Sequence, residues 1–154
     1  MIPNRSNAAR CIALIALMLT SAGCGTTYSR RNPVGEMFPT VQGRNLSDQP
    51  RQLPGDWAGE PVVVFVGYEQ NTQFDIDRWL LGMQQARINV RAYEVPTIPG
   101  LVPGLFAGTI DEGMRSGIPP EDWAIVITVY DDADKIARFA GNENGLPARV
   151  FLLD

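Results

Sequence analysis

The sequence contains no histidine and only two cysteines, Cys11 and Cys24, among its 154 residues. Without histidine the chain cannot build a Ser-His-Asp or Cys-His nucleophile system, or a metal site with histidine ligands. It also has no glycine-rich phosphate loop of the P-loop type. We therefore expect no cofactor and no metal, and the commonest hydrolase and nucleotide-binding designs are excluded.

No apolar run is long enough to cross a bilayer, which takes roughly 20 residues. The run at 11–19 follows a start that carries Arg5 and Arg10 and no acid. It ends in the small residues 20–23, directly before Cys24. A positive start, a short apolar middle and small residues at a cleavage site indicate a secretory signal. We assign residues 1–23 to a signal peptide, 24–34 to a tether and 35–154 to one domain.

The small residues that lead into Cys24 resemble the lipobox of bacterial lipoproteins. The resemblance implies that the Cys24 thiol takes a diacylglyceryl group and that cleavage follows Gly23. Ser21 departs from the leucine that is usual three residues before the cysteine. Two alternatives stay open, an ordinary signal peptide and a buried N-terminal helix with an incidental cysteine. Lipidation predicts an extracytoplasmic domain anchored in a membrane. Gly25 favours the outer membrane if the cell has two.

Charge and thiol content change when the signal is removed. Residues 1–23 contain two of the 13 basic residues and none of the 17 acidic ones, so the mature net charge is 11 − 17 = −6. Such an acidic surface repels phosphate backbones, and we expect no nucleic-acid partner. Cys11 leaves with the signal and Cys24 would be acylated. The mature domain then has no free thiol and no disulfide.

The hydrophobic pattern of the domain alternates between strands and helices. Continuous β-branched and aromatic runs are typical of strands buried on both faces, and apolar spacings of three and four indicate helices. This alternation predicts an α/β fold with a mostly parallel sheet covered on both faces. The pattern predicts strands at 61–68, 88–95, 123–130 and 147–154, helices near 72–83, 105–115 and 131–140, and a hairpin at 41–46.

The order of these segments is similar to the thioredoxin-like fold in its extended, peroxiredoxin-type form, a three-layer sandwich. The stretches "VVVFVGY", "FDIDRWLLGM", "INVRAYEV", "AIVITVY" and "GLPARVFLLD" carry the likeness. It implies that Pro147 is a cis-proline before an antiparallel strand. Within this superfamily, "GMRSGIP" followed by "DWAIVITVYDDADKIARFAG" resembles the mitochondrial ATP-synthase assembly factor family. That likeness marks Met114, Arg115 and Ile118 as a candidate partner surface; a helix end and turn is the alternative.

The chain departs from thioredoxins where their active-centre cysteines follow the first core strand. Residues 67–74 contain no sulfur, so thiol chemistry is not implied. Glu69, Asp75 and Asp77 occupy this active-centre position. They are candidates for acid–base work or, more simply, for helix capping. The family continues past the position of Asp154 with another antiparallel strand and a last helix. Either such elements complete the sheet or it keeps an open edge.

Two functions follow from these features. The first is a membrane-tethered, non-redox thioredoxin-like lipoprotein that binds or assists assembly of another envelope protein. The alternative is a thioredoxin- or peroxiredoxin-related redox lipoprotein that works through the thiols of a partner. The lack of histidine and of a free thiol argues against an enzyme but leaves the question open. The identity of the protein partner does not follow from the sequence.

Overall fold

The computed structural model describes residues 26–100, 107–145 and 147–154. The α-helices are α2 (Gln73–Gln85), α3 (Ala107–Gly117) and α4 (Ala133–Ala140). The strands are β1 (Val41–Asn45), β2 (Pro50–Leu53), β3 (Val62–Gly67), β4 (Arg91–Pro96), β5 (Ile127–Thr128) and β6 (Arg149–Leu153). The predicted strands at 61–68, 88–95 and 147–154 and the three predicted helices are all present, with bounds that differ by a few residues.

The central sheet has the order β4-β3-β6. Strand β3 pairs in parallel with β4, to which α2 connects it, and antiparallel with β6. A parallel pair needs such a crossover connection, and the helix supplies it. This β3–α2–β4 unit with an antiparallel strand on its other side confirms the predicted thioredoxin-like α/β arrangement. The run of valines explains why β3 is central, because its residues are apolar on both faces.

A second small sheet has the order β2-β1-β5, and both of its pairs are antiparallel. The predicted hairpin at 41–46 is wider than expected, since β1 pairs with β2 across a turn at residues 46–49. The predicted strand at 123–130 shortens to β5. Its flanking residues Val126 and Val129 instead form parallel bridges to Glu94 and Thr97. The 123–130 segment therefore divides its pairing between the two sheets.

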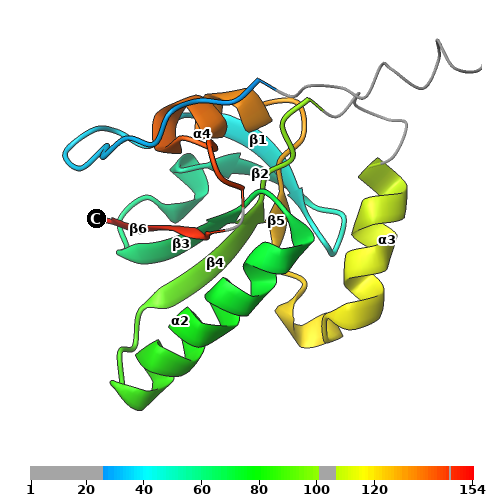
Figure 1. Ribbon diagram of the computed structural model, residues 1–154. Helices are drawn as coiled ribbons and strands as arrows, with labels where there is room; N and C mark the ends of the chain where they lie inside the picture. The colour runs from blue at the N-terminus through cyan, green and yellow to red at the C-terminus, as the bar shows by residue number, and fades with distance from the viewer. Residues whose placement is uncertain (1–25, 101–106, 146) are drawn as a thin grey trace, which may run out of the picture.

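The main core fills the space between one face of the central sheet and the layer made by β1, β2 and α4 (Figure 1). Alternate residues of a strand point to opposite faces, so Val62, Val64 and Val66 share this side. A cluster of aromatic side chains lies at one edge of this core. The ring centroids of Phe38 and Phe139 lie 5.4 Å apart, and other members are Trp57, Tyr93 and Phe151.

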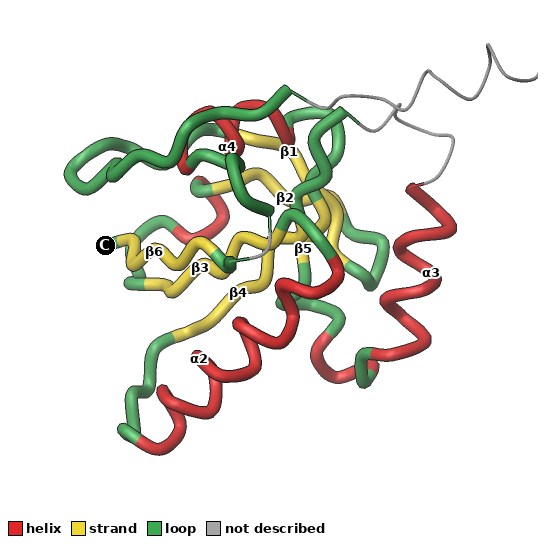
Figure 2. Tube along the Cα trace, viewed as in Figure 1, coloured by secondary structure: helices red, strands yellow, loops and turns green. Residues whose placement is uncertain are grey.

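The opposite face of the sheet is covered mainly by α2, which runs below it in Figures 1 and 2. Phe65 faces this side and is fully buried. Of the 13 residues of α2, only Ile76 is buried. Leu152 of β6 pairs with Val63 and so lies on the same face, yet its side chain is 66% exposed. The sheet is thus well packed on one face and only partly covered on the other.

The segment from Thr26 onward is docked on the domain, although the sequence suggested a tether up to residue 34. The Tyr28 amide donates to Asn142 Oδ1 at 2.6 Å, and the Asn142 amide donates to the Tyr28 carbonyl at 3.0 Å. The Arg138 guanidinium lies 5.3 Å from the Tyr28 ring centroid, a cation–π contact. Gly141 packs so closely against this segment that a Cβ would lie 2.6 Å from the Ser29 carbonyl oxygen.

No helix within the described ranges is long and apolar enough to span a bilayer. The predicted signal peptide and Cys24 lie outside the described residues. The first described residue, Thr26, is nevertheless only two positions after Cys24.

Candidate functional site

The segment after β3 folds into a short 3-10 turn, Gln70–Thr72, at the position of the thioredoxin active centre. Glu69 begins the turn, and its side chain and that of Thr72 form a reciprocal capping box. The Thr72 hydroxyl also donates to the Gly145 carbonyl at 3.1 Å. A Cβ on Gly145 would lie 2.5 Å from the Glu69 carboxylate, so a larger residue there would require the Glu69 side chain to move. These contacts hold the turn against the loop that leads into β6.

The other two acids of the predicted active-centre remnant also have local partners. Asp75 forms an ion pair with Arg78 at 2.8 Å and accepts a hydrogen bond from the Ala148 amide at 3.3 Å. Asp77 accepts a hydrogen bond from Gln73 Nε2 at 3.0 Å. Asp75 therefore joins the start of α2 to the start of β6, and Asp77 stabilises the first turn of the helix. Both acids thus have structural partners, but neither caps α2, whose N-cap residue Thr72 makes no side-chain capping hydrogen bond.

Metal and thiol ligands are absent from this part of the molecule. Within residues 26–100, 107–145 and 147–154, no group of three histidine, cysteine or acidic side chains is placed to hold a metal ion. The same ranges contain no cysteine, because Cys11 and Cys24 both precede them. The Leu146–Pro147 peptide bond, predicted to be cis, involves residue 146 and lies outside the described residues.

The candidate partner-binding residues Met114, Arg115 and Ile118 lie at the end of α3 and just beyond it, each half-buried. Arg115 Nε donates to the Leu46 carbonyl at 2.7 Å, which fastens α3 to the turn after β1. The Ile118 carbonyl accepts a hydrogen bond from Trp123 Nε1 at 2.9 Å. The structure thus places the three residues together, and it gives Arg115 and Ile118 structural contacts.

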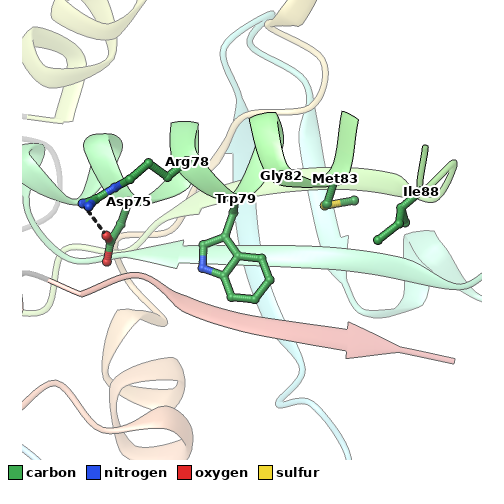
Figure 3. A pocket seen from close by; sticks show the side chains of 6 residues that line it. All are labelled: Asp75, Arg78, Trp79, Gly82, Met83 and Ile88. Carbon is green, nitrogen blue, oxygen red and sulfur yellow. Dashed lines mark hydrogen bonds and ion pairs between the residues drawn. The ribbon is translucent and has the colours of Figure 1, made fainter. Parts of the chain in front are cut away.

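A shallow, open groove runs along α2. It has a volume of about 420 Å³ and is lined by Asp75, Arg78, Trp79, Gly82, Met83 and Ile88. We call it the α2 groove. Figure 3 shows the ion pair at one end, the Trp79 indole directed from the helix toward the strands, and Met83 and Ile88 at the other end. Trp79 is 52% exposed and Ile88 is 51% exposed. The groove is therefore apolar along most of its length, with charge at one end.

A half-buried carboxylate lies on the same face of the sheet. Glu94 of β4 pairs with Phe65, which faces α2. Burial raises the pKa of Glu94 above its usual value. Repulsion from Asp77 and Asp122 adds to this shift, and a hydrogen bond with Gln73 opposes it. Glu94 is the one perturbed acid on this face that sequence reasoning did not single out.

Sequence reasoning did not identify the α2 groove, although the chain has three tryptophans, Trp57, Trp79 and Trp123. Trp57 is buried, and the Trp123 indole is hydrogen-bonded, whereas Trp79 is largely exposed. The sequence does carry a signal of excess apolar surface on α2. The stripe of Ile76, Trp79, Leu80 and Met83 predicts the side that faces the sheet, and Phe74 and Leu81 lie on the opposite side of the helix, outside the groove. An α2 with apolar residues on two sides has more apolar surface than one sheet face can bury.

No protein-family model and no curated protein matches the chain. Similar solved structures include a SCO1/SenC family lipoprotein from Bacillus anthracis str. Ames, at 14% identity and a TM-score of 0.47, with 82% of this chain and 83% of that chain covered. Another is the pneumococcal exposed lipoprotein thioredoxin Etrx1 from Streptococcus pneumoniae strain TIGR4, at 10% identity and a TM-score of 0.44, with 73% of this chain and 88% of that chain covered. Neither likeness assigns an activity to this chain. Its own strand order and pairing give it a thioredoxin-like α/β fold.

Proposed function

We propose that this chain is a membrane-tethered, non-redox thioredoxin-like lipoprotein that binds, or assists the assembly of, another protein of the cell envelope. The observation that carries the proposal is the exposed α2 groove, which lies beside the sulfur-free position of the thioredoxin active centre. The groove exposes Trp79, and tryptophan is the residue type most enriched among residues that dominate binding energy. Exposed apolar surface with a charged rim is typical of protein-binding sites.

The anchor is the second part of the proposal. Acylation of Cys24 would put the lipid two residues before Thr26, the first residue docked on the domain. Two extended residues span about 7 Å. The domain would therefore sit close to the membrane surface, with little freedom to diffuse away from it. Such a position suits a protein that meets other membrane-bound proteins, and Gly25 favours the outer membrane if the cell has two.

The absence of redox chemistry is the third part. Disulfide exchange requires a thiolate, and acylated Cys24 would not provide one. At the active-centre position, Glu69, Thr72 and Asp75 are engaged in contacts that hold the turn and β6 together. Rigid, locally satisfied groups support a scaffold function at this position. In the redox alternative, the partner protein would have to contribute every reactive thiol group.

Recovery of a partner from membranes tests this proposal. The tagged full-length chain is crosslinked gently in cells, extracted in neutral detergent and compared with Trp79→Gln and with Glu112→Gln, an exposed control on α3. We expect a discrete membrane protein that is recovered with wild type and Glu112→Gln and lost with Trp79→Gln. Equal recovery with all three chains would contradict the assignment to the α2 groove. Insulin reduction or peroxide consumption above buffer would favour the redox alternative.

A further inference from the structure

A second, smaller pocket lies on the other side of the sheet, where the docked N-terminal segment crosses the loop before β6. It has a volume of about 140 Å³ and is lined by Arg30, Gly141, Glu143, Asn144, Pro147 and Arg149. We call it the Arg149 pocket. A water molecule takes about 30 Å³ of liquid volume, so the pocket has room for a small polyatomic ion. Its walls come from two segments that are more than 100 residues apart in the sequence.

Arg149 reaches this pocket from the core face of the sheet. It pairs with Val66, and paired residues of neighbouring strands point to the same face. Its Nη2 donates to the Arg31 carbonyl at 2.9 Å. Its Nε is buried and has no hydrogen-bond partner among the described residues. A guanidinium at the edge of an apolar core, with one donor unsatisfied, calls for a physical explanation.

Tyr68 is a second unsatisfied group close by. It follows Val66 by two residues, which places it diagonally next to Arg149 on the core face. Its hydroxyl is also buried and without a partner in the described part of the chain. Burial raises the pKa of Tyr68, and the positive charge of Arg149 partly opposes this rise. Tyr68 does not line the pocket, so the unsatisfied donor that belongs to the pocket is that of Arg149.

The charges around the pocket do not balance. Arg30 and Arg149 repel each other, and this repulsion adds to burial in lowering the pKa of Arg149. Glu143 is the one acid in the lining, and its carboxylate accepts a 3.4 Å hydrogen bond from the Arg30 amide. Arg31, which is adjacent, already forms an ion pair with Glu36. The lining of the pocket therefore contains two arginines and one glutamate. A bound anion would balance the excess positive charge.

We propose that the Arg149 pocket binds a phosphate group, held by the guanidinium groups of Arg149 and Arg30. Arginine suits this ligand because its planar donors match the oxygens of a phosphate. The ligand is either free phosphate or the head group of a phospholipid. A head group is within reach, because Arg30 is six residues after Cys24 and six extended residues span about 20 Å. The phosphate site does not depend on the proposed protein partner.

Calorimetric titration of the full-length chain in neutral detergent and chloride buffer with inorganic phosphate tests the site. We expect saturable one-to-one binding, weakened about tenfold or more by Arg149→Gln. Arg30→Gln should also weaken it, and because Arg30 is exposed, this variant keeps the test valid if Arg149→Gln does not fold. Arg51→Gln on β2, far along the chain from the pocket, is the matched control and should bind like wild type. Absence of saturable binding, or equal binding by all variants, would overturn the proposal.

The source of the phosphate is decided by competition. Glycerophosphoglycerol is the water-soluble, diester head group of phosphatidylglycerol. If it displaces inorganic phosphate with similar affinity, the site belongs to lipid head groups. If it fails to displace phosphate at a hundredfold excess, the site belongs to free phosphate. Either outcome supports a phosphate site, whereas an unchanged titration of Arg30→Gln contradicts it.

Discussion

Two tryptophans of this chain occupy opposite environments, and their substitution should separate stability from binding. Trp57 is 7% exposed and its ring lies 5.0 Å from that of Tyr93 and 6.4 Å from that of Phe38. Replacing a buried aromatic residue by alanine costs about 3–5 kcal/mol of unfolding free energy. Trp57→Ala should lose an amount in this range in urea denaturation. Trp79→Ala, at an exposed helix position, should lose less than about 1 kcal/mol.

Similar losses for both variants would mean that Trp79 is a core residue. In that case the α2 groove would not be a free surface, and its proposed function would lose its basis.

Glu94 should make the stability of the domain depend on pH. Its folded-state pKa is raised, so the native state binds its proton more tightly than the unfolded chain does. Stability from this group is full below the unfolded pKa, about 4.3, and is lost as the pH rises from there through the folded pKa. Glu94→Gln removes this loss. We expect the variant to be more stable than wild type at pH 7, with a difference that shrinks toward pH 4.

The control for this prediction is Glu112→Gln, which changes an exposed acid on α3. It should show the same pH profile of unfolding free energy as wild type. A Glu94→Gln profile parallel to that of wild type would contradict the role assigned to burial.

At the residue scale, the sequence allowed the apolar core of β3 to be predicted, because a run of valines leaves few alternatives. It did not allow the environment of single aromatic residues to be predicted. Trp57 and Trp79 have the same side chain and differ only in what the folded chain places next to them. Likewise, the sequence predicts Arg149 only as a strand residue. It becomes part of a pocket because the segment Ser29–Arg31 docks beside it.

At the scale of elements, the close approach of the N-terminal segment to the end of α4 requires glycine at position 141. Gly141 has φ +79°, and an added Cβ would lie 2.6 Å from the Ser29 carbonyl oxygen and 2.7 Å from Arg30 Cα. Gly141 has ψ 146°, a conformation essentially confined to glycine, so Gly141→Ala should lose about 1–3 kcal/mol and should also push the segment away. The measurement is limited proteolysis with trypsin, which cleaves after Arg30 and Arg31. The variant should be cut there faster than wild type.

Gly59→Ala is the matched control, because Gly59 has φ +89° and no atom within 4 Å of the added Cβ. It should lose a similar amount of stability without faster cleavage at Arg30 and Arg31. If both variants are cleaved equally fast, the close contact at Gly141 does not hold the segment in place.

The hydrophobic pattern predicted some of these elements correctly and others not. Helix α4 was predictable, because its apolar residues Ile136, Ala137, Phe139 and Ala140 form one buried stripe. Strand β5 was predicted too long, because an apolar run does not reveal which neighbour it pairs with. The tether could not be predicted to dock, since its polar composition is also typical of a solvated linker. Its contacts depend on Asn142, which is distant in the sequence.

For the whole molecule, the asymmetry of the sheet is the main feature that the sequence did not reveal. Buried strands predicted layers on both faces, and the structure has them. Only one layer is complete, however, because Ile76 is the one buried residue of α2 and Leu152 stays exposed. The three-layer arrangement was thus predictable from the order of elements, whereas the completeness of each layer depends on side-chain contacts.

The proposed membrane anchor also concerns the whole molecule, and it has a direct test. Labelled palmitate supplied to cells should enter wild type and should be absent from Cys24→Ala. The variant should also keep its signal peptide and migrate more slowly on a gel, because cleavage before residue 24 follows acylation in lipoproteins. Equal labelling of both chains, or none in wild type, would rule out Cys24 as the lipidated residue.

The central claim is that the α2 groove contacts another envelope protein, and site-specific photo-crosslinking in living cells tests it most directly. A photoreactive amino acid is placed at Ile88, which lines the groove, and at Glu112 on α3 as a control. We predict one discrete crosslinked product from position 88 that Trp79→Gln removes, and no such product from position 112. No product from position 88, or a product that Trp79→Gln leaves unchanged, would contradict the account.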